Sequence, residues 1–518
     1  MPARSAARYV LGVDGGTEGV RCGVYEVHDG REVAYCSAHY PTSYPQPGWA
    51  EQDPEQWWSA LGAAVKGAVA RLGAAVAPQD IGALCVDTTC CTVVALDAAA
   101  NPLRPALLWM DVRAAAQAAR VAACCDEALL VNGGGSGPVS AEWFVPKALW
   151  LKENQPKLYA AAHSLCEYQD FINLRLTGSL VASSNNAAVR WHWRHGTTPP
   201  ASLLRALDLE DLLPKWPRSA LKPGQPIGRG LSAAAAKHLG LPEGLVVAQG
   251  GADAFIGMLG LNVLRPGQLA LLTGSSHLHL GVTASQVHGA GVWGTYAGAL
   301  PLGGRFVVEG GQTSTGSVAS WFRRLVSSDT DALVSYNALD AEAAAVPPGC
   351  EGLVCQEHFQ GNRTPHTDAA SRGALVGLTL RHGRGHLFRA ILEGVAFGTR
   401  LVLDQMRSAG FQPESITVAG GAARSPLWLQ IHADVTGLPL CVTRQGEAPA
   451  LGCAALAAVA CGAFENVEQA AEAMVHAERV VNPNMERHAA YEPFYQAYRE
   501  LYGATKGVVR AAAEAARV

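Results

Sequence analysis

Three glycine-rich turns constrain the fold of this chain more than any other feature of its sequence. They cover residues 14–19, 273–276 and 420–425, and each follows a short apolar run with the length of a strand. Glycine has no side chain, so such turns let the backbone lie directly against a ligand such as a phosphate. One turn of this kind is equally expected of a tight β-hairpin. Three in one chain favour a phosphate-binding role over three unrelated hairpins.

The second half of the chain repeats, loosely, the order of elements in the first half. An apolar strand leads into Gly250 and Gly251, Asp253 follows, and a later strand ends in a second Thr-Gly turn. A chain of 518 residues is also longer than one hydrophobic core usually serves. We therefore expect two domains, residues 1–250 and residues 251–518. Strands mixed with helices in this order predict the α/β class.

Hydrophobic periodicity and turn residues predict the other elements. Strands are expected at residues 81–87, 92–97, 245–248 and 268–272, and helices at residues 55–72, 114–130, 146–154 and 426–436. The proline-rich stretch of residues 197–230 is predicted to form irregular surface connections. Near the C-terminus four tyrosines recur at helical spacing, which indicates a packing face rather than a ligand site. They are Tyr491, Tyr495, Tyr498 and Tyr502.

Charge and cysteine usage argue against several classes of protein. The chain has 40 basic and 44 acidic residues and a net charge of −4, which does not indicate nucleic acid or an anionic membrane as a partner. Its 13 cysteines include no CxxC pair, so reduced thiols are expected rather than a metal site or a disulfide framework. Residues 1–8 hold no apolar signal core, and no apolar run is long enough to cross a bilayer. The expected location is the cytoplasm.

Asp14 and Thr17 give the first turn a chemistry of its own. An aspartate at a strand end can hold a magnesium ion through oxygen or water, and Thr17 adds a hydroxyl and an N–H group. The spacing excludes the dinucleotide fingerprint, and the turn lacks the Gly-Lys-Ser/Thr ending of a P-loop. The second turn offers the same donors. In the third, Gly420 and Gly421 lie between a strand and a helix, where bare backbone suits adenine or ribose.

Two stretches carry a resemblance to a known family. Residues 373–378, seven further residues and residues 386–393 fit the C-terminal signature of the FGGY carbohydrate kinases at every constrained position. Residues 147–154 match the second half of the upstream signature, but Pro146 lies directly before Lys147 instead of three residues ahead. The chain thus resembles the FGGY family of the actin, hexokinase and heat-shock ATPase superfamily. The resemblance covers essentially the whole chain and leaves the subfamily open.

This resemblance implies an α/β fold of two ribonuclease H-like, actin-type domains that flank a central catalytic cleft. It implies ATP and Mg²⁺ as cofactors, with Asp14 at the metal. Asp253 takes the place of the family's general base, and its alternative role is to cap the helix that follows it. The residues expected to bind the nucleotide are Thr17, Thr273, Gly274, Gly316, Gly420, Gly421, Ala422 and Ser425.

Four residues, besides Asp253 itself, resemble sugar contacts of the ribulokinase branch. Cys90 lies in an elbow where that branch usually has serine, and a thiol is a weaker hydrogen-bond partner than a hydroxyl. Trp109 either covers a face of the substrate or is an ordinary core residue. Glu309 ends an apolar run, which suits a ligand contact better than a surface position. Arg190 falls where the branch carries a sugar-contacting lysine, although a solvated arginine beside packed tryptophans is the favoured alternative.

These resemblances favour an enzyme that phosphorylates a pentulose, with ribulose as the first choice. Xylulose and a pentitol stay open, because one unpaired group in a pocket can reject an inverted hydroxyl. A non-catalytic sugar or nucleotide sensor on the same fold is the alternative from another class. The expected partners are a small sugar and ATP. The resemblance is the only basis for expecting a homodimer.

Overall fold

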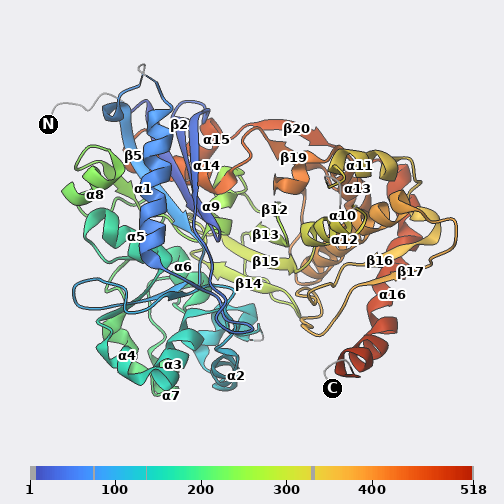
Figure 1. Ribbon diagram of the computed structural model, residues 1–518, viewed down its shortest axis with the longest axis horizontal. Coiled ribbons are helices and arrows are strands. Elements are labelled where there is room, and N and C mark those ends of the chain that lie inside the picture. The colour runs from blue at the N-terminus through green and yellow to red at the C-terminus, as the bar shows by residue number, and fades with distance from the viewer. Residues whose placement is uncertain (1–6, 74–75, 136, 328–332, 516–518) are drawn as a thin grey trace.

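The computed structural model describes residues 7–73, 76–135, 137–327 and 333–515, which form two lobes (Figure 1). The lobe on the left of Figure 1 contains the N-terminal half of the chain, and the lobe on the right contains most of the C-terminal half. Of the N-terminal segment 1–8, for which no signal sequence was predicted, the first six residues lie outside the described part. No helix in the described part is long and apolar enough to span a bilayer.

The first lobe is built on a five-stranded sheet with the strand order β11-β5-β1-β2-β3. β1 and β2 form an antiparallel hairpin that β3 extends, whereas β5 and β11 add parallel strands on the other side of β1. The parallel strands are apolar and largely buried, as strands covered on both faces should be. The bounds are β1 Tyr9–Gly15, β2 Gly19–Glu26, β3 Glu32–His39, β5 Ile81–Thr88 and β11 Val246–Ala248.

The second lobe repeats this pattern in a seven-stranded sheet of order β14-β15-β13-β12-β18-β19-β20. Here β12, β13 and β15 are antiparallel neighbours, and β18 and β19 follow as parallel strands on the other side of β12. The predicted two-domain α/β fold is confirmed, while the division at residue 250 stays a prediction. The bounds are β12 Gln268–Thr273, β13 His277–Thr283, β14 Trp293–Ala297, β15 Phe306–Gln312, β18 Ser415–Gly420, β19 Leu440–Thr443 and β20 Ala477–Val481.

Helix α14 (Ala448–Ala460) joins the lobes, because it belongs to the second half of the chain but packs on β1 and β5 of the first sheet. It also contacts α9 (Asp253–Gly260). A Cβ atom on Gly12 of β1 would clash with the carbonyl oxygen of Ala450, so strand and helix lie backbone to backbone. The many alanines of α14 allow this approach. One apolar core therefore continues from the first sheet into the second.

A smaller sheet of order β4-β7-β6-β8 completes the first lobe. The prediction of irregular surface connections for residues 197–230 is wrong in part. This stretch contains α7 (Ala201–Ala206) and a 3-10 helix (Glu210–Lys215), and five of its leucines are buried against a cluster of tryptophans: Leu203, Leu204, Leu207, Leu209 and Leu212. Other bounds in this lobe are β4 Glu51–Gln52, β6 Val93–Leu96, β7 Ala106–Leu107, β8 Ser164–Glu167, α1 Pro54–Ala70, α3 Phe144–Asn154, α4 Pro156–Ala161, α5 Tyr168–Thr177, α6 Ser184–Arg190 and α8 Ala233–Leu239.

The helix predicted over residues 114–130 ends early. α2 covers Ala115–Ala123, and a separate 3-10 helix covers Glu127–Val131. Between them Cys125 has a φ angle of +50°, which an α-helix cannot accommodate. The Asp126 side chain then accepts a hydrogen bond from the N–H of Ala128 and so starts the next helix.

The long helices of the second lobe pack against one another. α16 (Met485–Ala515) carries the tyrosine stripe, and Tyr491, Tyr495 and Tyr498 are buried, which confirms the predicted packing face. Their hydroxyls donate to carboxylates of the second lobe. The other bounds in this lobe are α10 Gly316–Leu325, α11 Tyr336–Ala344, β16 Val354–Gln356, β17 Ala374–Val376, α12 Arg384–Ser408 and α13 Pro426–Thr436. α15 (Val467–Met474) lies with α14 in the first lobe (Figure 1).

Gly452 on α14 tests the contact that joins the lobes. A Cβ atom there would clash with the carbonyl oxygen of Ile256 on α9, so Gly452→Ala should lower the free energy of unfolding by about 1–3 kcal/mol. In the matched control, Gly503→Ala on α16, the added Cβ meets no atom of the described residues within 4 Å. This control should stabilise the protein by up to about 1 kcal/mol. Denaturant unfolding measures both, and equal stability of the two variants would contradict the close packing.

Candidate active site

Three carboxylates meet at one edge of the first sheet. Asp14 lies near the end of β1, and Asp87 is its partner in the parallel register of β5. Asp253 starts α9 after the short loop of residues 249–252 that follows β11, and this loop is tied to β5 because Thr88 N–H donates to Gly251 O at 3.1 Å. The carboxyl ends of neighbouring parallel strands meet at the same edge of a sheet, which is where α/β proteins commonly bind ligands.

Two glycines fix the position of Asp253. A Cβ atom on Gly250 would clash with the backbone of β5, and one on Gly251 would lie 2.7 Å from Asn185 Oδ1. The same Asn185 Oδ1 accepts a hydrogen bond from Ala252 N–H at 2.9 Å. Ala252 occupies the N-cap position of α9, and Asp253 is the first helical residue. Asp253 is therefore not the N-cap residue itself, but its Oδ1 accepts a hydrogen bond from Ala254 N–H in the first turn at 2.7 Å, so a capping contribution remains.

The three carboxyl groups have raised pKa values, chiefly because they are buried. Burial raises the pKa of Asp253 to about 7, and the nearby charge of Asp14 adds to the effect. Burial also raises the pKa of Asp14, although Arg21 opposes it with Nη1 at 2.6 Å from Asp14 Oδ2. The pKa of Asp87 is raised well above its usual value by burial and then by Cys453 and the other two aspartates. A cation bound beside these carboxylates would offset the repulsion between their negative charges.

Asp14 and Asp87 together fit a hard divalent cation. The Oδ1 atoms of both residues are buried, and neither accepts a hydrogen bond from any residue that the structure describes. Buried polar atoms without partners are costly and mark a place for a ligand. Carboxylate oxygens are the ligands that Mg²⁺ prefers. The donor set therefore suits the predicted magnesium ion.

The first glycine turn is a hairpin between β1 and β2 that also contacts the predicted sugar side. Its backbone is closed by a hydrogen bond from Gly16 N–H to Gly19 O at 3.1 Å. Thr17 Oγ1 accepts a hydrogen bond from Trp109 Nε1 at 3.0 Å, and Thr17 O accepts one from Gln52 at 2.7 Å. The turn at residues 14–19 is thus a β-hairpin, and this does not conflict with the phosphate-binding role predicted for it. Trp109 is oriented by the turn rather than by an apolar core alone.

The second and third glycine turns are brought together by the parallel pairing of β12 with β18. Thr273 lies opposite Gly420, and its hydroxyl donates to Ala419 O at 2.8 Å and accepts from Ala422 N–H at 3.3 Å. Gly420 has a φ angle of +101°, and a Cβ atom there would clash with the Thr273 carbonyl oxygen. At Gly421 a Cβ atom would meet none of the described residues within 4 Å. This leaves bare backbone accessible, as a flat base or ribose requires.

Gly316 and Ser425 begin helices beside these turns. A Cβ atom on Gly316, the first residue of α10, would clash with Gly274 O, so the helix N-terminus lies against the second turn. Ser425 caps α13 by accepting Trp428 N–H at 3.1 Å, and its hydroxyl donates to Asp340 at 2.7 Å. All predicted nucleotide residues of the second lobe therefore lie in adjoining loops and helix ends. Their roles stay predictions.

Arg190 and Glu309 form a buried ion pair. Arg190 Nη2 donates to Glu309 Oε2 at 2.8 Å, and Arg190 Nη1 donates to the Tyr296 hydroxyl at 2.7 Å. The side chains are only 9% and 1% exposed, so the solvated arginine favoured from the sequence is wrong. Glu309 compensates the buried guanidinium, and this long-range pairing has no local sequence signal. Arg190 also lies 5.6 Å from the ring centre of Trp143.

An aromatic cluster completes this region. Cys91, Trp143 and Trp293 are buried together, and Cys90 and Trp109 pack against them from partly exposed positions. Both buried tryptophans have an indole N–H without a hydrogen-bond partner among the described residues. The four predicted sugar-side residues and the two additional tryptophans thus form one region. Its donors and acceptors suit a small polar ligand between aromatic walls.

Sequence reasoning missed several members of the site. Asp87 ends an apolar strand as Asp14 does, and that parallel could have identified it. Arg21 is a charged residue among the buried residues of β2, and this is a weaker indication of a place in the site. Trp143 and Trp293 carry no local signal, because they reach the site only through the tertiary fold.

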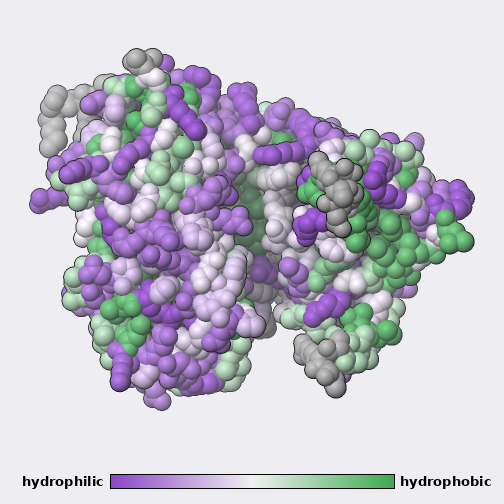
Figure 2. Space-filling model, in the orientation of Figure 1, coloured by the Kyte–Doolittle hydropathy of each residue, from purple (hydrophilic) through white to green (hydrophobic). Residues whose placement is uncertain are grey.

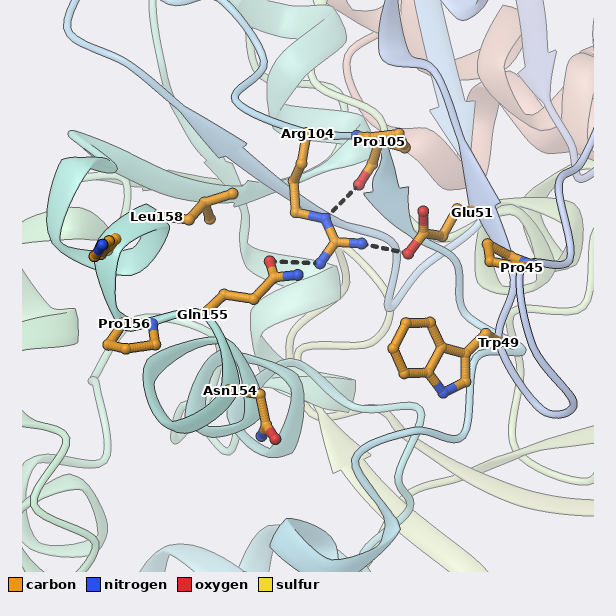
Figure 3. A pocket seen from close by; sticks show the side chains of 10 residues that line it. Pro45, Trp49, Glu51, Arg104, Pro105, Asn154, Gln155, Pro156 and Leu158 are labelled. Carbon is orange, nitrogen blue, oxygen red and sulfur yellow. Dashed lines mark hydrogen bonds and ion pairs between the residues drawn. The ribbon is translucent and has the colours of Figure 1, made fainter.

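A surface pocket in the first lobe is separate from this site. It has a volume of about 680 Å³, and none of the predicted site residues lines it (Figure 3). Arg104 crosses it and bonds to Glu51, Gln155 and the Pro105 carbonyl. Figure 2 shows a different hollow, the groove between the two lobes.

Comparison with known proteins supports the resemblance to the FGGY carbohydrate kinases that the sequence indicates. The model of the FGGY carbohydrate kinase N-terminal domain matches residues 9–260, and that of the C-terminal domain matches residues 269–461. A ribulokinase of Mycolicibacterium smegmatis is 33% identical, with 97% of this chain and 95% of the relative covered. A xylulose kinase of Escherichia coli is 31% identical, with 95% and 98% covered.

Among solved structures, the xylulose kinase of Rhodospirillum rubrum superposes with a TM-score of 0.84 at 29% identity. The alignment covers 97% of this chain and all of that one. Both family models match consecutive parts of the chain, and the relatives align over nearly their full length. The chain therefore belongs to the FGGY family of carbohydrate kinases, enzymes that transfer a phosphoryl group from ATP to a sugar.

Proposed function

We propose that this kinase phosphorylates a pentulose, with ribulose as the first candidate and Asp253 as the general base. The observation that carries the proposal is the buried Arg190–Glu309 pair beside the aromatic cluster, near the start of α9. Phe255, two residues after Asp253, has its ring centre 6.0 Å from the Arg190 guanidinium. The polar pair therefore lies near the first turn of α9, and we infer that Asp253, at the start of that helix, borders the same region. Relatives named ribulokinase and xylulose kinase support a five-carbon ketose.

In the proposed reaction, Asp253 accepts the proton of the attacking sugar hydroxyl. The hydroxyl oxygen bonds to the γ-phosphorus, the bond from that phosphorus to the bridging oxygen breaks, and ADP leaves. A general base works best when its pKa lies near the operating pH, and burial gives Asp253 a pKa of about 7. Phosphoryl transfer otherwise depends on positioning and charge neutralisation.

The remaining residues would position the nucleotide. Asp14 and Asp87 would hold Mg²⁺, which neutralises charge on the phosphates when bound. The turns at Thr17 and Thr273, with Gly274 and Gly316, would direct N–H groups and hydroxyls toward phosphate oxygens. Adenine and ribose would lie against the third turn; the residues concerned are Gly420, Gly421, Ala422 and Ser425.

A screen of acceptors tests the substrate proposal. ADP release should be fastest with D- or L-ribulose and slower with xylulose, pentitols, hexuloses and glycerol. A preference for xylulose or a pentitol would show that the enzyme is a kinase of that substrate instead of ribulose. ADP release without any acceptor would indicate an ATPase. No release under any condition would favour the non-catalytic sensor, which the intact set of aspartates and turns argues against.

Asp253→Asn tests the base. The variant should lower kcat by at least about 100-fold, because general-base catalysis typically contributes that much. It should also be more stable than the wild-type protein at pH 8. The folded-state pKa of Asp253 lies above its unfolded value, so ionisation destabilises the fold as pH rises from about 4 to 7. Melting temperatures at pH 5 and pH 8 check this, and near-normal turnover would refute the assignment.

The pH profile of kcat/KM gives a further test. Only the deprotonated carboxylate can accept a proton, so kcat/KM should fall about tenfold per pH unit below a pKa near 7. The residual activity of Asp253→Asn should lack this acidic limb. If both proteins show the same limb, another group controls it.

A further inference from the structure

One oxygen of the buried Glu309 carboxylate is left without a partner. Arg190 holds Oε2, whereas Oε1 accepts no hydrogen bond from any residue in the described part of the chain. The guanidinium of Arg363 lies nearby, with Nη1 at 3.8 Å from Oε1. This distance is too long for a direct hydrogen bond, and a ligand atom that bonds to both groups would satisfy the free oxygen.

Arg363 is placed so that it faces this region yet stays accessible. Its guanidinium lies 5.0 Å from the ring centre of Trp293, which is opposite Glu309 in the β14–β15 ladder. Its Cδ lies against Gly311, where a Cβ atom would come within 2.9 Å. The side chain remains 28% exposed, in contrast to the buried Arg190. It can therefore donate hydrogen bonds to a substrate.

We propose that Arg363 is a further substrate-binding residue, which recognises two neighbouring hydroxyls of the sugar together with Glu309. Glu309 Oε1 accepts from one hydroxyl, and the guanidinium of Arg363 donates to the next one. An acceptor beside a planar donor matches a vicinal diol, and each hydrogen bond to a charged group is stronger than a neutral one. This inference rests on the proposed sugar-binding role of Glu309.

The loop that carries Arg363 is fixed to the same strand as Glu309. Thr364 N–H donates to Gly311 O at 3.1 Å, and Gly311 N–H donates back to Thr364 Oγ1 at 3.2 Å. Asn362 and Asp368 close the loop with two backbone hydrogen bonds of 2.9 Å. The guanidinium is thus positioned relative to Glu309 by the backbone.

The C-terminal helix α16 holds the other side of this loop. Tyr502 donates to Asp368 Oδ2 at 2.8 Å, and Arg510 donates to the same oxygen at 2.9 Å. The Tyr502 ring also stacks on His366, with centres 3.8 Å apart. Tyr502 is therefore a positioning residue for Arg363, although it contacts no substrate itself.

Arg363→Met tests the contact, since it removes the charge but keeps a side chain of similar length. The KM for the sugar should rise at least tenfold, the KM for ATP should stay within twofold, and Arg363→Lys should recover part of the loss. The control is Arg381→Met, which removes a charge from a side chain that is 81% exposed and should change neither KM. Tyr502→Phe keeps the stacked ring and loses the hydroxyl, so it should raise the sugar KM alone by a smaller factor.

Deoxy substrates make the test specific. With the deoxy sugar that lacks the hydroxyl bound by Arg363, the Met variant and the wild-type enzyme should have equal KM values. An unchanged sugar KM in Arg363→Met, or an equal rise of the KM values for the sugar and ATP, would overturn the inference. So would an equally large rise of KM in Arg363→Met with every deoxy analogue. Failure of the pentulose proposal is separate, because it appears in the wild-type acceptor screen. The variants are then measured with whichever sugar the wild-type enzyme phosphorylates.

Discussion

The burial of three neighbouring carboxyl groups is the constraint on which the candidate site depends. Asp14 and Asp87 are held side by side by the parallel pairing of β1 and β5, and the loop before Asp253 is tied to β5 by the hydrogen bond from Thr88 N–H to Gly251 O. Burial raises the pKa of all three, the charge of Asp14 adds to the shift at Asp253 and Asp87, and Arg21 lowers the pKa of Asp14 and of Asp253. A cation bound at Asp14 and Asp87, as we propose, would offset the buried negative charge, and the proposed base Asp253 has its pKa raised to about 7.

The same edge is also where the lobes meet. α9 begins at Asp253 and packs on α14, which the second half of the chain contributes to the first lobe. Because this contact is backbone to backbone at Gly12 and Gly452, small shifts of one helix must be passed to its neighbour. Asp253, the proposed base, thus starts a helix that packs on the element that joins the two lobes.

The sequence predicted the features that are local in the chain and missed those that arise from tertiary contacts. The glycine turns and the two-domain α/β class followed from strand and turn chemistry. Arg190 was misjudged because its partner, Glu309, is 119 residues away. Trp143, Trp293 and Arg363 carry no local pattern that marks a ligand site. The prolines of residues 197–230 predict surface loops, whereas the burial of five leucines there against tryptophans depends on the packed lobe.

The most direct test of the central claim is the distance between Asp253 and the acceptor hydroxyl. A crystal structure with a pentulose, Mg²⁺ and a non-hydrolysable ATP analogue would measure it. The account predicts a carboxylate oxygen about 2.6–3.2 Å from the hydroxyl that faces the γ-phosphate. A bound sugar whose nearest hydroxyl lies beyond about 5 Å, or that bonds to another base in a closed complex, would contradict it.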